Sequence, residues 1–207
     1  CYNKPDLKKK NSVILYGSAA SGEYIDSHSN VNLLVILKDT GLVELGKSAK
    51  LVNKFQTLQP LFFTESYIYN STDIFPIEFL DMKENYNILY GKDVLKNLNI
   101  EQRNLRYQCE QELKAKLINL RQSYLKIHEN KSALRHLLFK TFTSTLHILR
   151  NMLRLKDKAV PYKKEEILNA LELEFKINMD TWRKILSAKG KQLKLAQREI
   201  EPLFIGF

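Results

Sequence analysis

Glycine, proline and cysteine are scarce in this chain of 207 residues, which contains seven, five and two of them respectively. So little glycine and proline excludes a collagen-like or low-complexity chain. Cys1 and Cys109 lie far apart in the sequence, so they indicate no disulfide framework. There is no apolar run of membrane-spanning length and no recognisable signal peptide, so we expect a cytoplasmic protein that does not bind membranes.

One half of the chain also lacks a net basic charge. Residues 1–99 contain 11 lysines, no arginine and 11 acidic residues, so their net charge is zero. The whole formal charge of +10 therefore belongs to residues 100–207. A basic C-terminal half favours a nucleic acid or another acidic partner, although a well-solvated helical surface explains the same charge.

Two apolar runs near the N-terminus predict strands that flank a tight turn. The first comprises residues 13–15 and stops at Gly17, and the second is almost continuous from residue 31 to residue 37. Gly17 and Ser18 favour a turn that approaches a ligand closely, and a helix beginning there would offer N–H groups and a hydroxyl to a phosphate. Alternation along the second strand places Asn30 and Asn32 on the same side.

This arrangement resembles the nucleotidyltransferase fold shared by DNA polymerase beta, the aminoglycoside nucleotidyltransferases and the small bacterial nucleotidyltransferases. The family pattern is an apolar strand, Gly-Ser, a variable stretch, and Asp-x-Asp opening a second apolar strand. Gly17-Ser18 and the spacing to residues 30 and 32 match, but asparagines occupy both aspartate positions. The resemblance covers roughly the first half of the chain and implies a nucleoside triphosphate ligand held by Gly17, Ser18, Asn30 and Asn32.

The resemblance also implies a third carboxylate, because the family uses two aspartates and an acid on a later strand to hold two Mg²⁺ ions. Residues 76–80, Pro-Ile-Glu-Phe-Leu, predict a strand with proline at its first position, and Glu78 fits the third carboxylate. An asparagine carbonyl supplies a dipole in place of a full charge, and asparagine is a poor general base. We therefore expect weak or absent Mg²⁺ binding, with Glu78 as the metal ligand and with Glu78, Asn30 and Asn32 at the catalytic positions.

The remaining periodicity predicts an α/β (α+β) domain with a mixed sheet over residues 1–99 and an all-α antiparallel helical bundle over residues 100–207. In the first domain we expect a helix over 42–57, a strand over 61–63 and either strand or helix over 65–74. In the second we expect helices over 101–128, 133–156, 163–175 and 180–198, with Ser132 as an N-cap, Leu117 in a packing stripe, and a break near Gly190. The combination resembles the aminoglycoside nucleotidyltransferases, in which the bundle helps to bind the acceptor.

Three functions follow from these patterns, and the sequence leaves all three open. The first is a nucleotidyltransferase-fold protein with little or no activity that binds a nucleotide or a partner. The second is an active Mg²⁺-dependent enzyme that moves a nucleoside monophosphate to a small molecule, a protein or RNA. The third is a helical domain that acts on RNA, because Arg121 and His128 fit the loose pattern of the HEPN domains.

Overall fold

The computed structural model describes residues 10–21, 30–156, 160–190 and 192–207. The chain forms two compact units, Cys1–Asn104 and Leu105–Phe207. The first unit contains all four strands of the sheet and the short helices between them. The second unit is helical, and each unit has its own apolar core.

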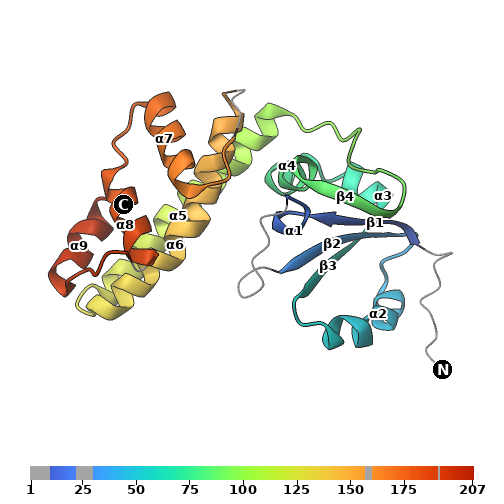
Figure 1. Ribbon diagram of the computed structural model, residues 1–207, viewed down its shortest axis with the longest axis horizontal. Coiled ribbons are helices and arrows are strands. Elements are labelled where there is room, and N and C mark those ends of the chain that lie inside the picture. Colours follow the sequence, from blue (N-terminus) through green and yellow to red (C-terminus); the bar gives the residue numbers. More distant parts are fainter. Residues whose placement is uncertain (1–9, 22–29, 157–159, 191) are drawn as a thin grey trace. The chain divides into compact units, whose positions relative to one another are not determined.

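The sheet of the first unit is mixed, as the sequence predicts (Figure 1). Its strands are β1 (Lys10–Tyr16), β2 (Val31–Leu37), β3 (Leu58–Thr64) and β4 (Tyr86–Gly91), in the spatial order β3-β2-β1-β4. β1 pairs antiparallel with both β2 and β4. β2 pairs parallel with β3, so these two strands begin at the same end of the sheet.

Four helices connect the strands: α1 (Ser18–Ser21), α2 (Leu42–Lys54), α3 (Glu65–Tyr69) and α4 (Pro76–Glu84). α3 and α4 pack on one face of the sheet, where their buried side chains meet those of β1 and β2. This core comprises Ile14, Leu34, Ile36, Ile68, Phe79, Met82, Val94, Leu95 and Leu98. Because Ile14 lies opposite Leu34 in the register, the even-numbered residues of β1 and β2 face these helices.

The strand predicted for residues 76–80 is wrong, because these residues begin α4. Pro76 occupies the first turn of the helix, where its missing N–H and fixed φ are tolerated. The buried side chains of Pro76, Phe79 and Met82 recur at a spacing of three, which is the helical stripe that a five-residue window does not reveal. The next strand along the chain, β4, lies at the opposite edge of the sheet from β3.

The second unit comprises α5 (Gln102–Ile127, which begins just before the division), α6 (Lys131–Arg154), α7 (Lys164–Phe175), α8 (Asp180–Lys189) and α9 (Gln197–Ile205). α6 contacts α7, α8 and α9 and is the central helix of the unit. The sequence predicts this position, because apolar residues occur around most of the helix circumference. Its core residues are Leu138, Phe142, Leu146 and Leu153, which pack with Ile167, Leu168, Leu171, Trp182, Ile185 and Leu203. None of the helices described is both long enough and apolar enough to cross a membrane.

Two details of the helical unit correct the sequence predictions, and a third confirms one. The N-cap of α6 is Asn130, whose side-chain oxygen accepts the Ala133 N–H at 3.0 Å, and Ser132 already lies inside the helix. Leu117 was expected in the packing stripe of α5, but 47% of its surface is exposed. The predicted break near Gly190 is confirmed: α8 ends at Lys189, Gly190 is its C-cap, and α9 begins at Gln197.

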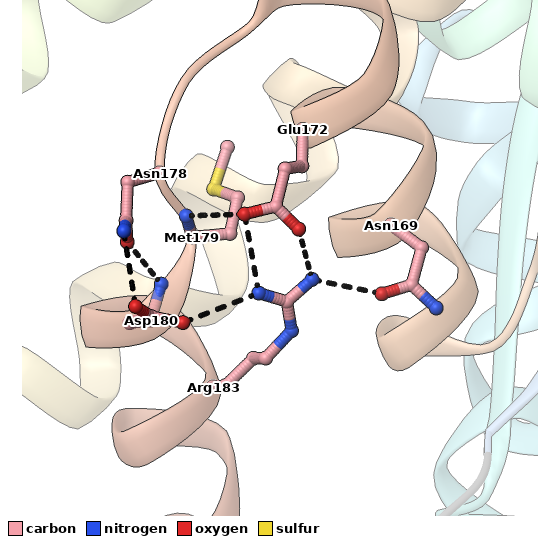
Figure 2. Close-up of polar contacts among 6 residues, drawn as sticks. All are labelled: Asn169, Glu172, Asn178, Met179, Asp180 and Arg183. Carbon is pink, nitrogen blue, oxygen red and sulfur yellow. Dashed lines mark hydrogen bonds and ion pairs between the residues drawn. The ribbon is translucent and has the colours of Figure 1, made fainter.

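A network of polar side chains fixes α8 to α7, as Figure 2 shows. The Arg183 guanidinium donates to Glu172 Oε2 at 2.5 Å and to Asn169 Oδ1 at 2.9 Å. Glu172 Oε1 also accepts the backbone N–H of Met179 at 3.4 Å, at the start of α8. The hydrogen bond from Arg183 is the largest cause that holds the pKa of Glu172 below its usual value. The pair therefore stabilises this joint in the charged form.

Candidate functional site

Four polar side chains form a row across one end of the sheet, on the face that α3 and α4 cover. Asn32 lies opposite Tyr16 of β1 and also opposite Gln59 of β3. Tyr16 in turn lies opposite Tyr86 of β4. Paired residues in a sheet point to the same face, so the row runs Gln59, Asn32, Tyr16, Tyr86. We call these four residues the sheet-end row.

The turn at Gly17 lies directly beside the row. Gly17 has φ +76°, a left-handed conformation that favours glycine. A Cβ atom at this position would lie 3.2 Å from the Asn32 amide nitrogen, so the amide fills the space that glycine leaves. The Gly17 N–H donates to the Asn85 carbonyl at 3.1 Å, which ties the turn to the residue that ends α4. Glycine here therefore permits both the turn and the close approach of Asn32.

The other predicted phosphate-binding residues flank this turn. Ser18 is the first residue of α1, and its hydroxyl is outside the part that the structure describes. Asn30 is exposed and directly precedes β2. The neighbouring Val31 N–H donates to the Thr57 carbonyl at 2.8 Å, which holds the start of β2 beside the start of β3. The chain near Asn30 is thus fixed at the same end of the sheet as Asn32.

Glu78 lies on α4 and is not part of the row. It is exposed in the first turn of the helix, whereas the contact to Gly17 comes from Asn85 at the other end. Seven residues of helix correspond to a rise of about 10 Å. The expected position of Glu78 on a strand beside Asn32 is therefore wrong, and its role as metal ligand and catalytic acid loses the geometry that motivated it.

Gln59, like Tyr16 and Tyr86, belongs to the row but was not among the residues expected at this site. It occupies the strand next to Asn32, in register with it, and its side chain is exposed. A local signal was present, because Gln59 precedes the apolar residues 61–63 much as Asn32 opens the apolar run of β2. Only the parallel pairing of β2 with β3 brings the two amides together.

The two tyrosines of the row are neutral at ordinary pH. Burial raises the pKa of Tyr16. Burial also raises the pKa of Tyr86, together with the hydrogen bond that its hydroxyl donates to Asp93 at 2.9 Å. The Asp93 carboxylate accepts two further hydrogen bonds, from the backbone N–H groups of Leu95 at 3.1 Å and Lys96 at 2.9 Å. The acid that contacts the row is thus already held by three donors.

The donor set of the site does not fit the two-metal centre that the fold family implies. Mg²⁺ in phosphate-transfer sites takes carboxylate oxygens together with phosphate and water, whereas Asn30, Asn32 and Gln59 supply only amides. Among the residues that the structure describes, no group of three or more His, Cys, Asp or Glu side chains could hold a metal ion. The described side chains of the site therefore form a hydrogen-bonding surface.

A hollow of about 620 Å³ lies along β3, and Gln59 of the row is among the residues that line it. Leu58, Pro60 and Phe62, which alternate with Gln59 along the strand, also line it. Val52 and Asn53 of α2 and the nearby Gln56 complete the lining. The hollow therefore adjoins the sheet-end row at Gln59.

Arg121 and His128, which suggested an RNA-acting helical domain, lie on and just beyond α5. Both are exposed, and the His128 ring lies 5.8 Å from that of Tyr124. The Tyr124 hydroxyl donates to Glu201 Oε1 at 2.7 Å, and Lys131 forms an ion pair with the same carboxylate. These contacts join α5, α6 and α9, so the surroundings of His128 have a structural role.

Comparisons with known proteins support the fold. No protein-family model matches the chain, and no curated protein sequence is similar to it. The solved structure of spectinomycin adenyltransferase AAD(9) from Enterococcus faecialis, with ATP and spectinomycin, is similar with a TM-score of 0.51 and 13% identity. The match covers 95% of this chain and 91% of that one. This chain therefore has a nucleotidyltransferase fold followed by a C-terminal helical region.

Proposed function

We propose that this protein binds a nucleoside triphosphate at the sheet-end row and has little or no nucleotidyl-transfer activity. The observation that carries the proposal is the pairing of Asn32 with Gln59 beside the Gly17 turn. The fold places metal-binding carboxylates on this part of the sheet in the family that the sequence resembles. In this proposal Asn30 and Asn32 stand at the two aspartate positions, and the Gln59 amide lies beside Asn32.

The chemistry of the transfer explains why activity should be lost. Displacement at a phosphorus atom depends on positioning and on metal ions that neutralise the developing charge. An amide adds no negative charge to attract those ions, and it does not deprotonate an acceptor hydroxyl at neutral pH. Asparagine at both aspartate positions thus removes the paired carboxylates that would anchor the metal ions and act as a general base.

Nucleotide binding, unlike nucleotidyl transfer, does not require metal ions or a general base. The amides of Asn32 and Gln59 offer hydrogen-bond donors to phosphate oxygens without any metal, and the Gly17 turn permits the close approach of a ligand. The structurally similar spectinomycin adenyltransferase was solved with ATP, which supports a nucleotide as the ligand here. The expected setting is a bacterial cytoplasm.

The test is a titration of the four nucleoside triphosphates, combined with an assay of pyrophosphate release in Mg²⁺ or Mn²⁺. We expect saturable binding of at least one nucleotide and no release above a protein-free control. The variant Asn30→Asp/Asn32→Asp/Gln59→Glu is the reference, because it restores the paired aspartates and adds a third carboxylate beside Asn32. If no nucleotide binds, the binding proposal is wrong. If the parent protein releases pyrophosphate faster than the protein-free control does, and as fast as the variant, the protein is an active nucleotidyltransferase.

A further inference from the structure

The sheet-end row offers neutral hydrogen-bond donors where a two-metal site would need negative charge. We propose that it binds the triphosphate of a nucleotide directly, without a divalent cation. This inference rests on the proposed function, because it specifies how the same site recognises the same ligand.

The amides supply donors that carboxylates lack. An asparagine or glutamine side chain carries two N–H donors, whereas an ionised carboxylate only accepts hydrogen bonds. The Asn32 amide nitrogen lies against the Gly17 turn, 3.2 Å from the position that a Cβ would take there. Gln59 follows in register on the edge strand, with its side chain exposed. Donors from two adjacent strands therefore converge beside the turn.

The charge of the row favours a bare phosphate. Gln59 and Asn32 carry no charge, and Tyr16 stays protonated because burial raises its pKa. Asp93, the acid that touches Tyr86, is already bound by one hydroxyl and two backbone N–H groups. A paired-carboxylate site repels phosphate until metal ions neutralise it, whereas this row has one hydrogen-bonded carboxylate at its Tyr86 end and none beside Asn32 or Gln59 in the register, so the repulsion is smaller.

A divalent cation should then give no advantage to binding. Mg²⁺ occupies phosphate oxygens that the amides would otherwise bind, and it lowers the charge that attracts them. The nucleotide should therefore bind at least as well when Mg²⁺ is chelated. A metal-dependent site behaves in the opposite way.

The experiment is a calorimetric titration of the full chain with ATP, in EDTA and in excess Mg²⁺. The parent protein should bind ATP in EDTA with a dissociation constant no more than about threefold weaker than in Mg²⁺, a small difference in binding free energy. Gln59→Glu should weaken binding in EDTA about tenfold or more, and Mg²⁺ should recover part of the loss. Gln122→Glu is the matched control: it adds the same charge on the exposed surface of α5, outside the row, and should leave both affinities unchanged.

The possible results separate the two proposals. Binding of ATP in Mg²⁺ but not in EDTA would overturn the metal-free mode and leave nucleotide binding intact. No binding in either condition would overturn the proposed function itself. Gln59→Leu, which removes the donors without adding charge, tests the residue if Gln59→Glu does not fold. It should weaken binding about equally in both conditions, and an unchanged affinity would remove Gln59 from the site.

Discussion

The side chains of Asn32 and Gln59 lie opposite each other on adjacent parallel strands, at the end of the sheet where the Gly17 turn begins. This pairing brings two amides together beside the turn, where we propose that a nucleotide binds.

Restoring the carboxylates should cost stability in the absence of metal. In Asn32→Asp/Gln59→Glu, two like charges face each other across the strands, which we expect to cost about 1 kcal/mol. For a protein of this size the melting temperature should fall by about 2–4 °C. Added Mg²⁺ should bind the folded state and recover the loss, whereas the parent protein should not respond. Thermal melts of both proteins with and without Mg²⁺ make the comparison, and a strong Mg²⁺ response of the parent would contradict it.

Gly17 should be sensitive to the smallest substitution. Gly17→Ala places a Cβ at φ +76°, which costs about 1–2 kcal/mol, and pushes it against the Asn32 amide. Gly46 is the control, because a Cβ there meets nothing within 4 Å and lies inside α2. Gly46→Ala should raise stability by about 0.5–1 kcal/mol. Urea denaturation measures both, and equal effects would mean that the Gly17 turn is not constrained.

The Arg183–Glu172 pair should make the helical unit sensitive to acid. The hydrogen bond from Arg183 lowers the pKa of Glu172, so the unfolded chain binds this proton more readily than the folded protein does. The contribution is fully present above the ordinary pKa of about 4.3 and is lost as the pH falls through the lower folded value.

Glu172→Gln tests this linkage. The fall in melting temperature between pH 7 and pH 3 should be smaller in the variant than in the parent protein. Glu129→Gln is the control, because the Glu129 side chain is 91% exposed. If both variants keep the parent's pH dependence, the pair does not contribute to acid sensitivity.

The basic half of the chain should bind nucleic acid only weakly. Several of its cations already serve the helical unit: Lys131 pairs with Glu201, Arg183 with Glu172, and Arg150 donates to the Pro161 carbonyl at 2.8 Å. We expect gel shifts with RNA or DNA at about 50 mM salt that disappear by about 200 mM, because such binding depends on counterion release. A complex that persists at the higher salt would indicate a specific nucleic-acid surface.

The strands, the turn and most helices were predictable because their signals are local. The apolar runs before Gly17 and after Asn32 predicted β1 and β2, and the helical periodicity after residue 101 predicted α5 to α8 within a few residues. Glu78 was misplaced because Pro-Ile-Glu-Phe-Leu is too short to distinguish a strand from a buried helical turn. Gln59 was missed because its partner is 27 residues away, and only the register of two parallel strands brings them together.

The most direct test is a crystal of the parent protein soaked with ATP and Mn²⁺, with anomalous scattering recorded at the manganese edge. The account predicts a triphosphate beside Gly17, with its oxygens in hydrogen-bond contact with the amides of Asn32 and Gln59. It also predicts no manganese ligated by a protein side chain. A manganese ion about 2.0–2.2 Å from a side-chain oxygen of Asn30, Asn32, Gln59 or Glu78 would contradict the central claim. A triphosphate bound elsewhere on the chain would do the same.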